Sequence, residues 1–122
     1  MPDTNKLFLA VFLGGPSSPR MALWAKMSDA EGNQKQREGV AAWQAWFKSN
    51  ETSIAGLGSP LGKTQRVSAQ GIAATRNELS AYTVVRAASR EAAAKLFENH
   101  PRFTIFPGEA VEVMECLPVL GQ

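Results

Sequence analysis

The chain has 122 residues, a length that fits one domain spanning residues 1–122 and buries roughly two-thirds of the unfolded surface. Its 13 basic and 11 acidic residues give a net charge of +2 and form no basic stripe, which argues against a nucleic-acid partner. One cysteine and one histidine exclude an intrachain disulfide and leave too few ligands for a thiolate or histidine metal site.

The first element is the apolar run at residues 7–13, which is apolar at both odd and even positions. This pattern predicts a strand covered on both faces. The run is short for a signal peptide, and only one basic residue, Lys6, precedes it. No window of the sequence reaches the ~20 apolar residues of a membrane helix. We therefore expect a cytoplasmic protein with no membrane partner. Residues 14–19 then predict a turn, within a loop that extends to Met27.

A helix is predicted from Ser28 to about Ser49. The stretch Ser28-Asp29-Ala30-Glu31 fits a capping box, in which the serine and glutamate side chains bond each other's backbone N–H groups. Val40, Trp43 and Phe47 follow at spacings of three and four and form the apolar stripe of the helix.

The stretch GLGSPLGKT at residues 56–64 ends like a nucleotide-binding P-loop. That motif requires a glycine five positions before Gly62, where this chain has Leu57. Residues 65–69 also favour an extended chain over the helix that a P-loop needs. The stretch therefore predicts a turn between a short strand at 52–57 and a polar strand at 63–69, and we expect no nucleotide or other cofactor.

After a turn at Gly71, residues 79–86 predict a strand and Ser89 the start of a second helix, which Pro101 stops. Residues 111–117 predict the last strand. This order predicts an α+β, ferredoxin-like antiparallel sheet with two helices on one face. The other face needs a cover, which two copies packing sheet against sheet supply, so we expect a homodimer.

The sequence resembles the YCII-related (YciI-like, DGPF-type) family, whose members are dimeric α+β barrels. The segments that carry the resemblance are residues 24–31, 58–61, 71–79, 82–85 and 111–115. The family's Asp-Gly-Pro-Phe signature reads Gln70-Gly71-Ile72-Ala73 here. The resemblance implies the fold and the dimer, and some relatives are ring-cleavage-pathway lyases or isomerases. A His/Asp pair has been proposed as their site, and residues 28–31 and 58–61 lack it here.

Five residues are candidates for a site: His100, Arg66, Arg76, Trp24 and Tyr82. A cap at the C-terminus of the second helix is enough to explain His100, which is also the one candidate for a catalytic base. Arg66 and Arg76 can clamp a carboxylate or pair with surface acids. Trp24 can stack on a flat ligand or brace the first helix, and Tyr82 lies on a mostly apolar strand. Cys116 is expected to be a small buried hydrophobe.

These residues predict the binding of a small aromatic or carboxylated metabolite, with Trp24, Arg66, Arg76 and Tyr82 as ligand-binding residues. Lyase or isomerase chemistry is one extension of that hypothesis, and whether the protein is an enzyme is left open. The alternative is a non-catalytic dimeric module for protein interaction or regulation. An interior cavity of about 300 Å³ or more that is lined by these residues favours ligand binding, and a dry, filled interior favours the alternative.

Overall fold

The structure is a computed structural model that describes residues 6–14 and 19–119, with the backbone alone described at residues 19 and 20. The strands are β1 (Lys6–Leu13), β2 (Ile54–Pro60), β3 (Thr64–Ser68), β4 (Gly71–Thr75), β5 (Leu79–Ala87) and β6 (Ala110–Glu115). The helices are α1 (Pro19–Ala25), α2 (Asp29–Ser49), α3 (Arg90–Lys95) and α4 (Pro101–Thr104), with a 3-10 turn η1 at Glu51–Ser53.

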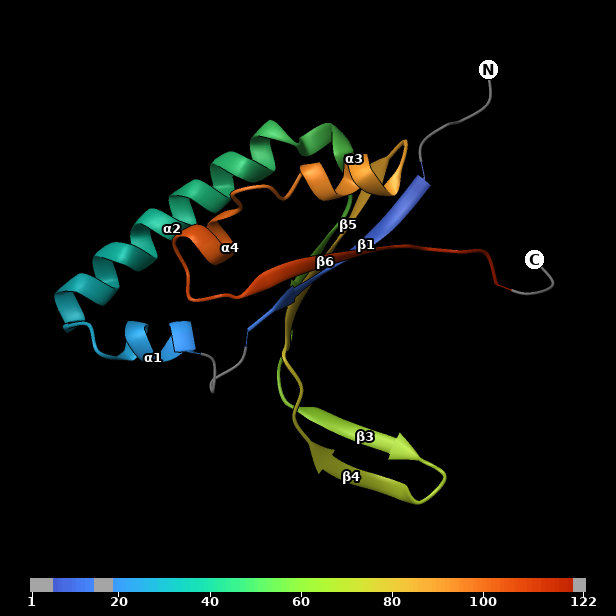
Figure 1. The fold of residues 1–122 in the computed structure, drawn as a ribbon, viewed down its shortest axis with the longest axis horizontal. Coiled ribbons are helices and arrows are strands. Elements are labelled where there is room, and N and C mark those ends of the chain that lie inside the picture. The colour runs from blue at the N-terminus through green and yellow to red at the C-terminus, as the bar shows by residue number, and fades with distance from the viewer. Residues whose placement is uncertain (1–5, 15–18, 120–122) are drawn as a thin grey trace.

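Four strands form the main sheet in the order β2-β5-β1-β6, and all three pairings are antiparallel. This is the ferredoxin-like order, because the first and third strands of the sheet lie in the middle and the second and fourth lie at its edges. Helices α2, α3 and α4 lie along one side of the sheet (Figure 1). The predicted fold class is therefore confirmed. None of the helices in the described ranges is long and apolar enough to cross a membrane.

The core lies between this sheet and the helices. Phe8, Ala10 and Phe12 of β1 are buried, and they meet Val85 of β5 and Ala93 of α3. The alternate residues of β1 lie on the other face and keep part of their surface exposed. Within a single chain, one face of β1 is thus buried. That a second copy covers the other face stays a prediction.

The segment expected to be a loop at 14–27 contains helix α1, so that expectation was wrong. Pro19 stands at the first helical position, where its missing N–H costs nothing, and good helix formers follow it. The turn expected at residues 14–19 falls largely on residues 15–18, which lie outside the described part of the chain.

The predicted capping box of α2 is confirmed. The Glu31 backbone N–H donates to the Ser28 hydroxyl, and the Ser28 backbone N–H donates to the Glu31 carboxylate, each at 3.2 Å. These hydrogen bonds, chiefly the one from the Ser28 backbone, hold the pKa of Glu31 below its ordinary value.

The GLGSPLGKT stretch is mainly strand, where a turn was expected. β2 continues through Gly58 to Pro60, and residues 61–63 connect it to β3. Gly58 has φ of +75°, and the pairing of β2 with β5 shifts register between Gly56 and Ser59. A bulge therefore accommodates the glycines inside the strand.

Residues 64–75 form a two-stranded hairpin, β3–β4, which we call the arm. The sequence predicted its first strand but placed only a turn at Gly71, where β4 begins. The arm extends away from the main sheet and the helices (Figure 1).

Candidate functional site

A cleft of about 420 Å³ opens between α2, β2 and α4. Its lining is mostly apolar, with one amide and one guanidinium: Val40, Trp43, Gln44, Phe47, Leu57, Arg102 and Phe106. The predicted apolar stripe of α2 is thus part of the wall of an open cleft as well as of the core. An apolar cleft with few polar groups is the usual form of a small-molecule site.

Trp43 forms the inner wall of the cleft and is held by other aromatic rings. Its ring meets that of Phe12 edge-to-face, with centroids 5.3 Å apart, and that of His100 at 4.6 Å. Phe106 lies 5.9 Å from it across the cleft lining. A ring fixed on several sides loses little entropy when a flat ligand packs against it.

Phe106 is positioned from both sides. Trp24 of α1 stacks on its ring at a centroid distance of 5.8 Å and 24° between planes. Gly39 of α2 leaves room on another side, because a Cβ there would lie 2.5 Å from the Phe106 ring. Trp24 therefore reaches the cleft through Phe106.

Arg102 supplies the positive charge of the cleft. Its Nη2 donates to the Gly14 carbonyl at 3.2 Å and to the Ser80 hydroxyl at 2.9 Å, and its Nε is buried with no hydrogen-bond partner among the described residues. Among the described residues no carboxylate lies within salt-bridge distance of its guanidinium. Burial lowers the pKa of Arg102 from its ordinary value. A half-buried cation with neutral partners is stabilised by any carboxylate that enters the cleft.

His100 does not cap the end of the preceding helix, as its structural interpretation supposed. Helix α3 ends at Lys95, and His100 is the N-cap of α4, where its Nδ1 accepts from the Arg102 backbone N–H at 3.0 Å. Pro101 likewise begins a helix here, because a proline needs no hydrogen-bond acceptor at the first position.

The His100 side chain is fully buried, and its Nε2 has no hydrogen-bond partner in the described part of the chain. Four rings surround it, those of Phe12, Trp43, Trp46 and Phe97. Burial, with a smaller contribution from the Arg102 charge, lowers the pKa of His100 to about 4. The imidazole is neutral at pH 7, and a role as a general base stays a prediction.

A second hollow of about 310 Å³ adjoins the cleft and shares Trp43 and Leu57 with it. Its lining includes Phe12, Tyr82 and Thr83, between β2 and β5. The Thr83 hydroxyl donates to the Leu57 carbonyl at 3.1 Å and so fixes the β2 wall. Of the predicted ligand-binding residues, Tyr82 is the one that lies at this double hollow.

The structure does not bring the two predicted arginines to the cleft. Arg66 lies in β3 and is exposed, and Arg76 directly follows β4 at a hollow near the base of the arm. That Arg66, Arg76, Trp24 and Tyr82 contact a ligand stays a prediction. Cys116 is exposed, and the expectation of a buried thiol was wrong, because the chain leaves β6 at Glu115.

Sequence reasoning missed Arg102, Trp43 and Phe106 as site residues. Trp43 was predicted as part of the apolar stripe of the first helix, and no element was predicted between Pro101 and residue 111. The sequence His100-Pro101-Arg102-Phe103 held one signal, since an arginine between apolar rings and a helix-starting proline is a candidate for a half-buried cation. Only the fold shows that it meets α2.

The architecture and the cleft define a small ferredoxin-like α+β protein with an aromatic, singly cationic pocket. No family model matches the chain, and no curated protein sequence matches it. Among solved structures it is similar to 5-chloro-2-hydroxyhydroquinone dehydrochlorinase from Burkholderia phenoliruptrix, in a complex with 2,5-dihydroxybenzoquinone. The two share 18% identity over 88% of this chain and 89% of that chain, with a TM-score of 0.46. The strand order given above, and not this likeness, defines the fold class.

Proposed function

We propose that this chain is a YCII-related-type protein that binds a small aromatic carboxylate in the cleft between α2, β2 and α4. The observation that carries the proposal is Arg102, a half-buried cation with neutral hydrogen-bond partners at the wall of an aromatic cleft. A ligand carboxylate would pair with the guanidinium, and its ring would lie against Trp43 and Phe106.

The size of the cleft agrees with such a ligand. Its volume of about 420 Å³ lies within the range of small-molecule sites, although the cleft is open and the residues predicted from the sequence to bind a ligand do not line it. Gln44 adds one polar group at the cleft, where its amide can orient a hydroxyl or a second carboxylate oxygen. The proposal is a binding function, and lyase or isomerase chemistry and a cytoplasmic location stay predictions.

The functional unit we propose is a homodimer packed sheet against sheet. On the face of the sheet away from the helices lie Leu7, Val11, Val84 and Met114, all at least partly exposed in the single chain. A second copy would cover this apolar face. Light scattering should give twice the chain's 13.2 kDa at micromolar concentration, and a monomer would contradict the dimer.

A thermal-shift screen of benzoic, salicylic and other small aromatic acids tests ligand binding. A ligand at one hundred times its dissociation constant stabilises a protein by about 2.7 kcal/mol, which a melting curve resolves. We expect hits among aromatic acids and none among the matching amides, because the amides lack the charge that pairs with Arg102. Equal shifts for acid and amide would contradict the role of Arg102.

Gln44→Glu is the sharpest variant, because it places a carboxylate at the cleft without a change of shape. We expect it to weaken the binding of an aromatic acid at least severalfold, since the new carboxylate competes for the Arg102 charge and repels the ligand. Gln36→Glu adds the same charge to an exposed position of the same helix and is the matched control. Equal weakening by both variants would point to a bulk charge effect and against this cleft.

A further inference from the structure

The arm has an apolar face that its own chain leaves exposed. Val67 and Ile72 are directly opposite each other across the hairpin, and they are 75% and 69% exposed. In the described ranges β3 and β4 pair only with each other. A two-stranded hairpin is marginal in water on its own, so a hairpin with exposed apolar side chains indicates a packing partner.

The two faces of the arm differ in chemistry. Side chains alternate along a strand, so Arg66 lies on the face opposite to Val67, across from Ala73. Residues 61–77 contain Lys63, Arg66 and Arg76 and no acidic residue. The arm is therefore apolar on one face, cationic on the other, and positively charged overall.

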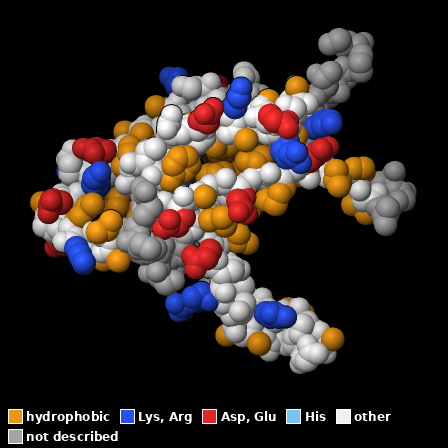
Figure 2. All heavy atoms as spheres, in the orientation of Figure 1, with side chains coloured by type: hydrophobic (Ala, Val, Ile, Leu, Met, Phe, Trp, Pro, Cys, Tyr) orange, Lys and Arg blue, Asp and Glu red, His pale blue; other side chains and the backbone are white. Residues whose placement is uncertain are grey.

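The edge strand β6 offers the complementary surface. It pairs only with β1 within the described sheet, so the hydrogen-bonding groups along its other side have no strand partner. On the helix side, an open groove of about 600 Å³ lies between α3 and β6, with Phe97, Val111 and Val113 in its lining. Figure 2 shows apolar side chains gathered in this hollow.

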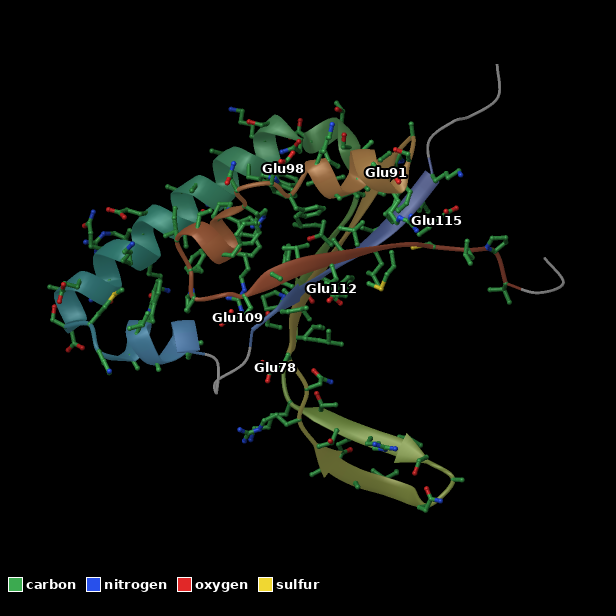
Figure 3. All side chains as sticks on the ribbon, viewed as in Figure 1. Glu78, Glu91, Glu98, Glu109, Glu112 and Glu115 are labelled. Carbon is green, nitrogen blue, oxygen red and sulfur yellow. The ribbon has the colours of Figure 1, made fainter. Side chains whose placement is uncertain are left out.

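Acidic side chains border both faces of that edge. Glu91 lies in α3, Glu98 follows that helix and Glu109 directly precedes β6, and all three are in the groove lining (Figure 3). Their one ion pair in the described chain joins Glu91 to Arg90 at 3.9 Å. On the opposite face of β6, Glu112 is exposed, across from Val11 of β1.

We propose that the arm of one copy adds as a strand to the β6 edge of a second copy. The pleats of adjoining strands match, so an arm placed with Val67 and Ile72 toward the groove packs them near Val111 and Val113. The same placement puts Arg66 on the face that carries Glu112. Apolar side chains would then pack together on one face, and Arg66 would lie near Glu112 on the other.

The charges favour a second copy of this chain as the molecule whose β6 edge binds the arm. The arm carries Arg66, with Lys63 and Arg76 directly beside it in the chain, and glutamates border both faces of the edge it would join. Each copy has one arm and one edge, so two copies related by a two-fold axis form two such contacts and close the assembly. This inference does not depend on ligand binding in the Arg102 cleft.

Sedimentation of charge-swapped variants tests the contact. We expect Arg66→Glu and Glu112→Arg each to raise the dimer dissociation constant at least tenfold, and the double variant to recover most of that loss. Arg37→Glu reverses an exposed charge on α2 and should leave the constant unchanged. Val67→Ser with Ile72→Ser should weaken the dimer similarly while the monomer fold, followed by circular dichroism, stays intact.

Two results would overturn the inference. One is a wild-type protein that stays monomeric through the micromolar range. The other is a dimer whose dissociation constant is the same in the arm variants as in the wild type, which would leave the sheet-against-sheet dimer in place without the arm. Loss of dimerisation with unchanged thermal shifts by aromatic acids would support the arm contact and keep it separate from the cleft.

Discussion

The imidazole of His100 and the backbone of Arg102 are joined by one hydrogen bond, in which the Arg102 N–H donates to Nδ1 at 3.0 Å. This bond ties the N-terminus of α4 to the aromatic core, and it holds the chain that carries the cleft's cation. An imidazole that accepts at Nδ1 carries its proton at Nε2, and that atom is buried. The hydrogen bond that holds the Arg102 backbone therefore requires the neutral form of His100.

Acid should destabilise the protein through His100. Burial lowers its folded-state pKa to about 4 from an ordinary value of 6.5. Between these values the unfolded chain binds a proton that the folded chain does not, so the free energy of unfolding falls as the pH falls through that window. The full effect is about 3 kcal/mol, reached near pH 4 and absent above pH 7.

His100→Asn isolates this effect, because the chain has one histidine. Asparagine can cap α4 but does not titrate. The variant loses ring contacts and should be less stable at pH 7, but its stability should fall less steeply from pH 7 to pH 4.5 in urea titrations. Parallel stability curves for the two proteins would contradict a neutral, buried His100.

Gly39→Ala should destabilise the fold by roughly 1–3 kcal/mol through overpacking. The new Cβ would lie 2.5 Å from Cε2 and Cζ of Phe106, which Trp24 holds from its other face. Intrinsic helix propensity alone would favour alanine by up to about 1 kcal/mol, so the two effects have opposite signs. Thermal melts of the variant measure which one dominates.

Gly32→Ala is the matched control, since it lies in the same helix and a Cβ there meets nothing within 4 Å. We expect it to stabilise the protein by up to about 1 kcal/mol. A Gly39→Ala variant that gained stability as Gly32→Ala does would show that Phe106 moves freely, against a preformed cleft.

The strand order was predictable because it rests on local patterns. The capping box at Ser28 and Glu31 fixes the start of α2, and the spacing of Trp43 and Phe47 gives its apolar stripe. Short apolar runs, such as residues 7–13, then predict the strands around it. Each of these signals depends on residues within one or two turns of one another, which a sequence displays directly.

The cleft was not predictable, because it depends on contacts between distant segments. Arg102 reaches Gly14 and Ser80, which lie 88 and 22 positions away. Helix α4 has four residues, too few for a periodic signal, and the aromatic cage of His100 joins β1, α2 and the turn after α3. A lone histidine near a helix end gave no sign that the next helix begins there.

Ser80→Ala should loosen Arg102. The Ser80 hydroxyl accepts from Arg102 Nη2 and donates to the Phe12 carbonyl, each at 2.9 Å, so the variant leaves a half-buried donor and an acceptor unpaired. The cost should be about 1–3 kcal/mol of unfolding free energy, with weaker binding of any aromatic acid. Urea titrations and thermal shifts measure the two effects.

Ser49→Ala, at the exposed end of α2, should change the unfolding free energy by no more than about 0.5 kcal/mol. If Ser80→Ala is as mild as this control, water or another group replaces the hydroxyl. Arg102 would then be held by the rest of α4 and not by the sheet.

The bulge in β2 should fail when Gly58 gains a side chain. Its φ of +75° lies in the left-handed region that disfavours other residues, and a Cβ there would overlap the Tyr82 carbonyl of the neighbouring strand. Since β5 lies between β2 and β1 and is fixed on both sides, β2 must separate from it to relieve the overlap. We expect Gly58→Ala to cost at least 2–3 kcal/mol of unfolding free energy, the range for strained backbone with a steric clash.

Gly62→Ala is the matched control, because it lies four residues on, in the connection to β3, where a Cβ meets nothing within 4 Å, and it should be nearly neutral. Hydrogen exchange should then show faster opening of β2 in Gly58→Ala alone, and equal protection in the two variants would contradict a rigid wall for the cleft.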